Sequence, residues 1–182
     1  MLKSALGAGA ITIVPRHVLG GKGTLAPADR ITLGFIGTGK QSIGLMKSIH
    51  GCPETLVLAA CDADLKKLER FRKTAELANA EKLNGGSQPV EGYENYRELL
   101  ERKDIDAVVI VTPDHWHAMM AVDAARAGKD IYCEKPLALT VAEGRAMVSA
   151  ARKYNRVVQT GNMQRSWRNF RHACEMVYNG YI

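Results

Sequence analysis

Short apolar runs alternate with longer segments of helical spacing along most of this chain. The apolar runs predict strands at residues 31–36, 56–61, 107–111, 131–133 and 157–160, with a further short strand near Val90. Apolar residues three or four positions apart predict helices at residues 63–79, 94–102, 114–127, 140–154 and 167–179. Strands that alternate with helices are typical of an α/β fold, so the pattern predicts a doubly wound parallel sheet.

A glycine-containing turn follows the first predicted strand. Gly37 and Gly39 separate that strand from a helix whose apolar residues are Ile43, Leu45, Met46 and Ile49. In this context the first glycine permits a tight turn, and the second lets a diphosphate approach the free N–H groups of the helix N-terminus. Ser42 occupies the position of the third glycine of a dinucleotide-binding turn. The motif indicates nucleotide binding.

An acidic residue ends the second predicted strand. Asp62 lies 25 residues after Gly37, where a carboxylate hydrogen-bonds the adenosine ribose in dinucleotide-binding folds. A carboxylate there repels a 2′-phosphate, and Asp64 adds to this effect, so NAD is favoured over NADP. Lys66 and Lys67 weaken the preference, because a flexible lysine one turn into the next helix could reach a phosphate. The alternative role for Asp62 is an ordinary helix N-cap.

A lysine and a glutamate lie where the strand near residue 131 ends. Glu134 and Lys135 are thereby expected at the carboxyl edge of the sheet, where ligands of parallel sheets bind. Oxidation of an alcohol needs a group that polarises the oxygen and moves its proton, and a lysine in a closed cleft suits that task. The alternative is a solvated loop lysine.

Five segments together resemble the Gfo/Idh/MocA family, the group of NAD(P)-dependent enzymes that includes glucose-fructose oxidoreductase and inositol dehydrogenase. The matching segments are Gly37-Thr38-Gly39, Cys61-Asp62, residues 111–117, Glu134-Lys135-Pro136 and residues 160–165. The resemblance implies a Rossmann-type NAD-binding domain and a sugar or polyol substrate. It does not imply a nucleic-acid partner.

The resemblance also assigns site residues. It implies cofactor-binding roles for Gly37, Thr38, Gly39, Gln41, Ser42, Asp62, Thr112, Pro113, His117, Glu134, Lys135 and Asn162. Lys135 is implied to be catalytic, acting at the reacting carbinol. His117, near the start of a predicted helix, has a structural hydrogen-bonding role as its alternative. No metal site is expected, because no cluster of His, Cys or carboxylate residues has ligand spacing.

The family places a larger α/β domain after its nucleotide-binding domain, and that domain completes the active site. We therefore expect an export-signal-like, flexible segment at 1–29, the NAD-binding domain at 30–164 and the start of a largely absent C-terminal domain at 165–182. On this interpretation the 182-residue chain binds NAD but lacks a complete active site. The full-length form is expected to be a homo-oligomer.

Three functions remain open at this point. The first is a sugar or cyclitol dehydrogenase, which Lys135 favours. The second is an NAD-dependent glycosidase or lyase of the same family, in which the lysine is commonly replaced, so its presence argues against this alternative. The third is a noncatalytic NAD-binding module.

The composition is globular, with 46% hydrophobic and 24% charged residues. Residues 145–182 contain seven basic residues and one acidic residue, which equals the net charge of +6 for the whole chain. Because no nucleic-acid-binding motif accompanies this segment, we interpret it as a solvated helix face. The predicted helix at 167–179 carries an apolar stripe, and we expect it either to fold back or to mediate self-association. The stripe consists of Trp167, Phe170, Cys174 and Val177.

The N-terminus resembles the end of a twin-arginine export signal. Its apolar stretch at 5–14 is too short to span a bilayer, and no integral membrane segment is expected. Export to the periplasm is expected if the start lies upstream of Met1, and a cytoplasmic location if the chain begins there. The four cysteines have no disulfide-scaffold spacing, and Cys61 and Cys133 lie in predicted strands, so both are expected to be reduced core thiols.

Overall fold

The computed structural model describes residues 25–182. The chain divides into two compact units, residues 1–30 and residues 31–182. The described part of the first unit contains one short 3-10 turn, η1 (Pro27–Asp29). Most of the predicted export segment lies outside the described residues, and export stays a prediction. No helix in residues 25–182 is long and apolar enough to cross a membrane.

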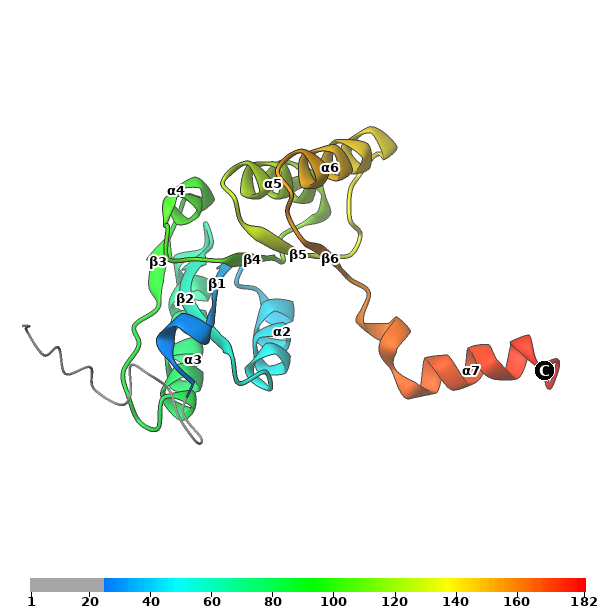
Figure 1. The fold of residues 1–182 in the computed structure, drawn as a ribbon, viewed down its shortest axis with the longest axis horizontal. Helices are drawn as coiled ribbons and strands as arrows, with labels where there is room; N and C mark the ends of the chain where they lie inside the picture. The colour runs from blue at the N-terminus through cyan, green and yellow to red at the C-terminus, as the bar shows by residue number, and fades with distance from the viewer. Residues whose placement is uncertain (1–24) are drawn as a thin grey trace, which may run out of the picture. The chain divides into compact units, whose positions relative to one another are not determined.

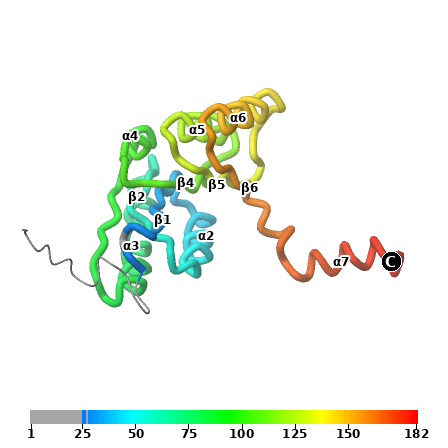
Figure 2. The backbone as a smooth tube through the Cα atoms, viewed as in Figure 1, coloured from blue at the N-terminus to red at the C-terminus, as the bar shows by residue number. Residues whose placement is uncertain are grey.

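The second unit is built on a six-stranded sheet in the order β3-β2-β1-β4-β5-β6 (Figure 1). Every neighbouring pair is parallel. The strands are β1 (Ile31–Ile36), β2 (Thr55–Cys61), β3 (Glu91–Tyr93), β4 (Ala107–Ile110), β5 (Asp130–Glu134) and β6 (Val158–Gly161). The chain steps outward from β1 to β3 and then returns past β1 to β4, as the tube in Figure 2 shows. The predicted doubly wound, Rossmann-type parallel sheet is confirmed.

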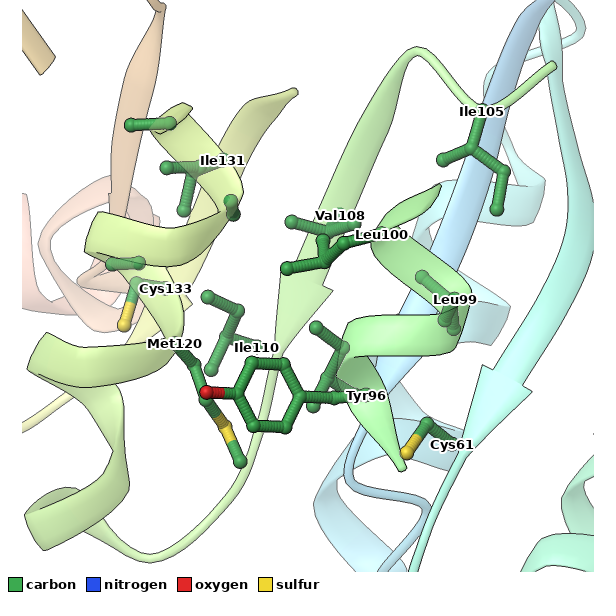
Figure 3. Close-up of a cluster of buried hydrophobic side chains, with 14 of the residues drawn as sticks. Cys61, Tyr96, Leu99, Leu100, Ile105, Val108, Ile110, Met120, Ile131 and Cys133 are labelled. Carbon is green, nitrogen blue, oxygen red and sulfur yellow. The ribbon is translucent and has the colours of Figure 1, made fainter. Parts of the chain in front are cut away.

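Helices cover both faces of this sheet. They are α2 (Lys40–His50), α3 (Leu65–Lys82), α4 (Tyr96–Glu101), α5 (Asp114–Arg126) and α6 (Val141–Lys153). After β6, the turn η2 (Met163–Ser166) leads to one more helix, α7 (Arg168–Tyr178). One buried cluster joins α2 and α3 to the sheet, around Phe35 and Phe71. A second joins α4, α5 and α6 to the opposite face; Figure 3 shows Leu99, Val108 and Ile110 within it. The strands β1, β2, β4 and β5 are therefore mostly buried on both faces, which explains their continuous apolar runs.

Most predicted boundaries agree with the structure to within one or two residues. The helix expected to end at residue 79 continues to Lys82, whose ammonium donates hydrogen bonds to the carbonyl oxygens of Cys52 and Thr55. The short strand expected near Val90 begins one residue later, at Glu91. At both places the observed element contacts a segment distant in the sequence, since Lys82 bonds to Cys52 and Thr55, and Glu91 pairs with Ala59.

Cys61 and Cys133 are buried in strands, as expected for core thiols. Burial is the main cause that raises the pKa of each thiol to about 12. Both are therefore protonated and unreactive at neutral pH.

Helix α7 has no buried residue. Its predicted apolar stripe is exposed, with Trp167 at 52% and Val177 at 61% exposure. The expectation that the stripe folds back onto the domain is therefore wrong for the described residues. Self-association through this stripe stays a prediction.

A buried asparagine completes the hydrogen bonds of an irregular strand. The β1–β2 register shifts between Leu33 and Gly34, and β3 pairs with β2 only from Ala59 onward. Val57 therefore lacks a strand partner on its outer edge. Asn79 of α3 supplies one, because its Nδ2 donates to the Val57 carbonyl at 2.7 Å and its Oδ1 accepts from the Val57 N–H at 3.2 Å.

We predict that Asn79→Leu lowers the free energy of unfolding by about 2–4 kcal/mol, because two buried backbone groups lose their partners. Urea unfolding followed by circular dichroism measures this change. Leu77→Ala, at a 69% exposed position of the same helix, is the control and is expected to change stability by less than about 0.5 kcal/mol. Equal stability of the two variants would show that Asn79 is not needed at the irregular strand.

Candidate dinucleotide-binding site

The turn after β1 closely contacts the neighbouring strand end. Gly37 has a φ of +90°, and a Cβ at this position would lie 2.5 Å from the carbonyl oxygen of Val111. Its N–H donates to the Cys61 carbonyl at 2.8 Å, which ties the turn to the end of β2. Only glycine fits these two conditions, because other residues rarely adopt this φ and have a Cβ that would collide.

The second glycine of the turn faces open space. Gly39 is the N-cap of α2, no side chain caps this helix end, and a Cβ at Gly39 would meet no atom within 4 Å. The first N–H groups of α2 therefore have no side-chain cap at the carboxyl edge of the sheet. Such an end binds phosphate oxygens, through its N–H donors and the positive end of the helix dipole.

Asp62 lies directly after β2 and is connected to the turn. Its Oδ2 accepts hydrogen bonds from both the N–H and the hydroxyl of Thr38, each at 2.7 Å. Its Oδ1 accepts from the Asp64 N–H at 2.9 Å. Asp64, not Asp62, is the N-cap of α3, where it accepts from the N–H groups of Lys66 and Lys67. The helix-cap alternative for Asp62 is therefore wrong.

A pocket of about 760 Å³ opens between these strand ends, within the size range of small-molecule sites. Its lining includes five residues of the predicted cofactor set: Gly37, Gly39, Asp62, Thr112 and Pro113. Several lining residues were not predicted from the sequence, among them Asn95, Tyr96, Arg97, Trp116 and Met120. The first three follow β3, and ligands of parallel sheets bind at the carboxyl ends of the strands. A prediction of where β3 ends would therefore have indicated these three residues.

Three members of the predicted cofactor set are fully buried, and each contacts a residue that lines the pocket. Thr38 holds Asp62, and the Ser42 hydroxyl donates to the Gly39 carbonyl at 2.7 Å. His117 lies with Nδ1 2.7 Å from the Pro136 carbonyl oxygen and Nε2 2.8 Å from that of Thr112. Its ring thus links the segment after β4 to the segment after β5, in line with the structural alternative.

The remaining predicted residues lie near the end of β5. The buried Glu134 carboxylate accepts from Gln41 Nε2 at 3.3 Å and from the Lys135 N–H at 3.0 Å. Gly161 of β6 makes room for it, since a Cβ there would lie 2.9 Å from Glu134 Cδ. Asn162 is exposed and donates to the Thr160 hydroxyl at 3.0 Å.

The Lys135 ammonium is exposed and has no hydrogen-bonding or ionic partner within residues 25–182. It is not part of the lining of the 760 Å³ pocket. Its catalytic role stays a prediction. The same described part of the chain contains no group of three or more His, Cys, Asp or Glu residues arranged to hold a metal ion.

The strand order, the glycine turn and the strand-end carboxylate together define a dinucleotide-binding domain. Residues 31–162 match the Gfo/Idh/MocA model, described as an oxidoreductase family with an NAD-binding Rossmann fold. The chain belongs to this family.

Curated relatives have glycosidase names. A glycosyl hydrolase family 109 protein of Shewanella pealeana is 36% identical over 69% of this chain and 27% of its own length. An alpha-N-acetylgalactosaminidase of Shewanella oneidensis is 33% identical over 82% of this chain and 32% of its own. The chain thus spans less than a third of the length of these relatives. They support the glycosidase alternative better than the dehydrogenase interpretation that Lys135 favoured.

Solved structures with a similar fold include dehydrogenases. The scyllo-inositol dehydrogenase of Lactobacillus casei, with bound NAD(H) and scyllo-inositol, has a TM-score of 0.69 and 26% identity, over 84% of this chain and 42% of its own. Another similar structure contains NADP. The family is therefore NAD(P)-binding, and the choice between the two cofactors is a finer question.

We predict that alanine has different effects at the two glycines of the turn, lowering stability at Gly37 and weakening dinucleotide binding at Gly39. Gly37→Ala is expected to lower the free energy of unfolding by about 2–4 kcal/mol, because of its φ and the collision with Val111. Gly39→Ala is expected to change stability by no more than about 1 kcal/mol, yet to weaken dinucleotide binding about 10-fold or more, since its methyl group enters the space for the diphosphate. Thermal unfolding and calorimetric titration measure the two effects.

Gly44→Ala is the control for both glycine variants. This helical position also has no atom within 4 Å of a Cβ, and it does not line the pocket. It is expected to leave binding unchanged and to raise stability by about 0.5–1 kcal/mol. If Gly39→Ala binds as tightly as Gly44→Ala, the diphosphate does not lie at this turn.

Proposed function

We propose that this chain is the NAD-binding domain of an NAD-dependent glycosidase that acts on sugars. The single observation that carries the cofactor assignment is the pocket at the strand ends, where the Gly37 turn, the uncapped start of α2 and the Asp62 carboxylate meet. These are the three features that a dinucleotide needs for its diphosphate and its adenosine ribose.

NAD is the proposed cofactor in preference to NADP. The pocket lining contains three acidic side chains, Asp62, Asp64 and Glu94, and two basic ones, Lys67 and Arg97. A 2′-phosphate would bring additional negative charge toward this acidic lining. The ribose hydroxyls of NAD instead donate hydrogen bonds to a carboxylate.

The glycosidase assignment rests on the names of the curated relatives. Bound NAD supplies a hydride acceptor that oxidises a sugar transiently, so that elimination of the glycosidic substituent can follow. In this chain α2 and Asp62 would hold the dinucleotide, and Lys135 would move a proton at the reacting carbinol. The cycle returns NAD to its starting state and so produces no net NADH.

A dehydrogenase is the second candidate. It is favoured by the exposed Lys135 without a partner in the described part of the chain, and by the inositol dehydrogenase among the structural neighbours. A dehydrogenase releases NADH in proportion to the alcohol oxidised, which separates the two candidates experimentally.

We predict that Asp62→Asn weakens NAD binding by about 1–3 kcal/mol, because a charged hydrogen bond to the ribose is lost. Calorimetric titration of the 182-residue chain with NAD and with NADP measures it. In a Trp167→Phe background, the fluorescence of Trp116 in the pocket lining gives a second readout. Glu54→Gln is the control, since it removes an equal charge just before the amino end of the same strand. Equal NAD binding by the two variants would exclude Asp62 from the site.

We predict that the complete gene product hydrolyses a nitrophenyl α-N-acetylgalactosaminide only when NAD is present and without accumulation of NADH. Released nitrophenol and absorbance of NADH are measured together. Lys135→Ala is expected to lower the rate roughly 100-fold, the usual size of the loss of a proton-transfer group.

Lys103→Ala, at an exposed position preceding β4, is the control for a lost surface charge. Accumulation of NADH with a sugar or an inositol, in place of hydrolysis, would establish the dehydrogenase. Unchanged rates in Lys135→Ala would assign the proton transfer to another group.

A further inference from the structure

Hydrogen bonds from the protein occupy most of the acceptor positions of the Asp62 carboxylate. A carboxylate has about four acceptor positions, and three are occupied by Thr38 N–H, Thr38 hydroxyl and Asp64 N–H. The remaining position is on Oδ1, because Oδ2 already accepts two hydrogen bonds. The carboxylate is thus fixed in the pocket before any ligand arrives, and it cannot rotate away without breaking these bonds.

The two cations of the pocket lining are also held by carboxylates. Lys67 Nζ lies 3.0 Å from Asp64 Oδ2, and Arg97 Nη2 lies 3.3 Å from Asp123 Oδ2. Hydrogen bonds from Lys67 hold the pKa of the Asp64 carboxyl below its ordinary value, so Asp64 is anionic at neutral pH. Lys66, the other lysine of this turn, does not line the pocket.

We propose that Thr38 and Asp64 determine the choice of NAD over NADP: Thr38 fixes the Asp62 carboxylate at the ribose position, and Asp64 withholds Lys67 from a 2′-phosphate. The proposal rests on the dinucleotide site proposed above and names the residues that make it selective. Thr38 is fully buried and acts through Asp62, so it is a positioning residue.

The same contacts explain why a 2′-phosphate is excluded. An NADP-binding site must move its acid aside and offer a cation to the phosphate. Here the acid is fixed by Thr38, and the nearest cation of α3 already has an anionic partner. The Thr38 N–H is also occupied by Asp62, which leaves the diphosphate to the N–H groups at the start of α2.

The test is the ratio of the NADP to the NAD dissociation constant, measured by calorimetry on the 182-residue chain. Thr38→Val removes the hydroxyl and keeps the side-chain shape, and it is expected to lower the ratio about 10-fold, because one of the bonds that fix Asp62 is lost. Thr38→Ser keeps the hydroxyl and is expected to retain the ratio of the unaltered chain. Rescue by serine separates the hydrogen bond from packing.

Asp64→Asn tests the role of Asp64 at a half-buried position. Asparagine caps a helix as well as aspartate does, so stability is expected to be unchanged, while the released Lys67 lowers the ratio about 2- to 5-fold. Adding Lys67→Gln to Asp64→Asn is expected to restore the ratio, and the gain in NADP affinity of Asp64→Asn alone is expected to decrease as salt is raised.

The outcomes distinguish this inference from the proposed function. A chain that binds neither dinucleotide would overturn both. If the unaltered chain prefers NAD, but Asp64→Asn and Thr38→Val keep its ratio, the proposed roles of Thr38 and Asp64 are wrong and the dinucleotide site stands. If Thr38→Val does not fold, Thr38→Ser together with Asp64→Asn and its double variant still decides, since an unchanged ratio in Asp64→Asn overturns the role of Lys67.

Discussion

The carboxyl end of β1 meets the carboxyl end of β4 with no room for a side chain between them. A Cβ on Gly37 would lie 2.5 Å from the Val111 carbonyl oxygen, and the Gly37 N–H is bonded to the end of β2. Three strand ends are thereby brought together by one residue. The position of the pocket, the direction of α2 and the placement of Asp62 all depend on this close contact.

Around this contact, the domain separates residues that support the site from residues that face it. Thr38, Ser42 and His117 are buried and bond to the backbone or to Asp62, whereas Gly39, Asp62 and Pro113 line the open pocket. Because a site must be rigid before it can discriminate, the buried set is as much a part of recognition as the lining set. This division is also why removal of a buried hydroxyl is informative about a cofactor that the hydroxyl does not touch.

The described residues define a cofactor pocket, and the chain spans less than a third of the length of its curated relatives. The turn and the strand-end carboxylate suit a dehydrogenase and an NAD-dependent glycosidase equally well, because both begin with hydride transfer to the same cofactor. A fold of this kind defines how the cofactor is bound, and the residues around the sugar define the product. Lys135 favours a dehydrogenase, whereas the names of the curated relatives favour a glycosidase.

The order and type of the elements, the glycine turn and the family followed from the sequence, because apolar periodicity and a turn motif are local properties of the chain. Only the tertiary structure decided which residues of α4 line the pocket and which side chain bonds to Val57. It also decided that Asp64, and not Asp62, caps α3. Asp62 and Thr38 are 24 positions apart, and Asn79 and Val57 are 22 apart. Which side chains meet over such separations depends on strand register and crossover geometry, and no local pattern encodes these.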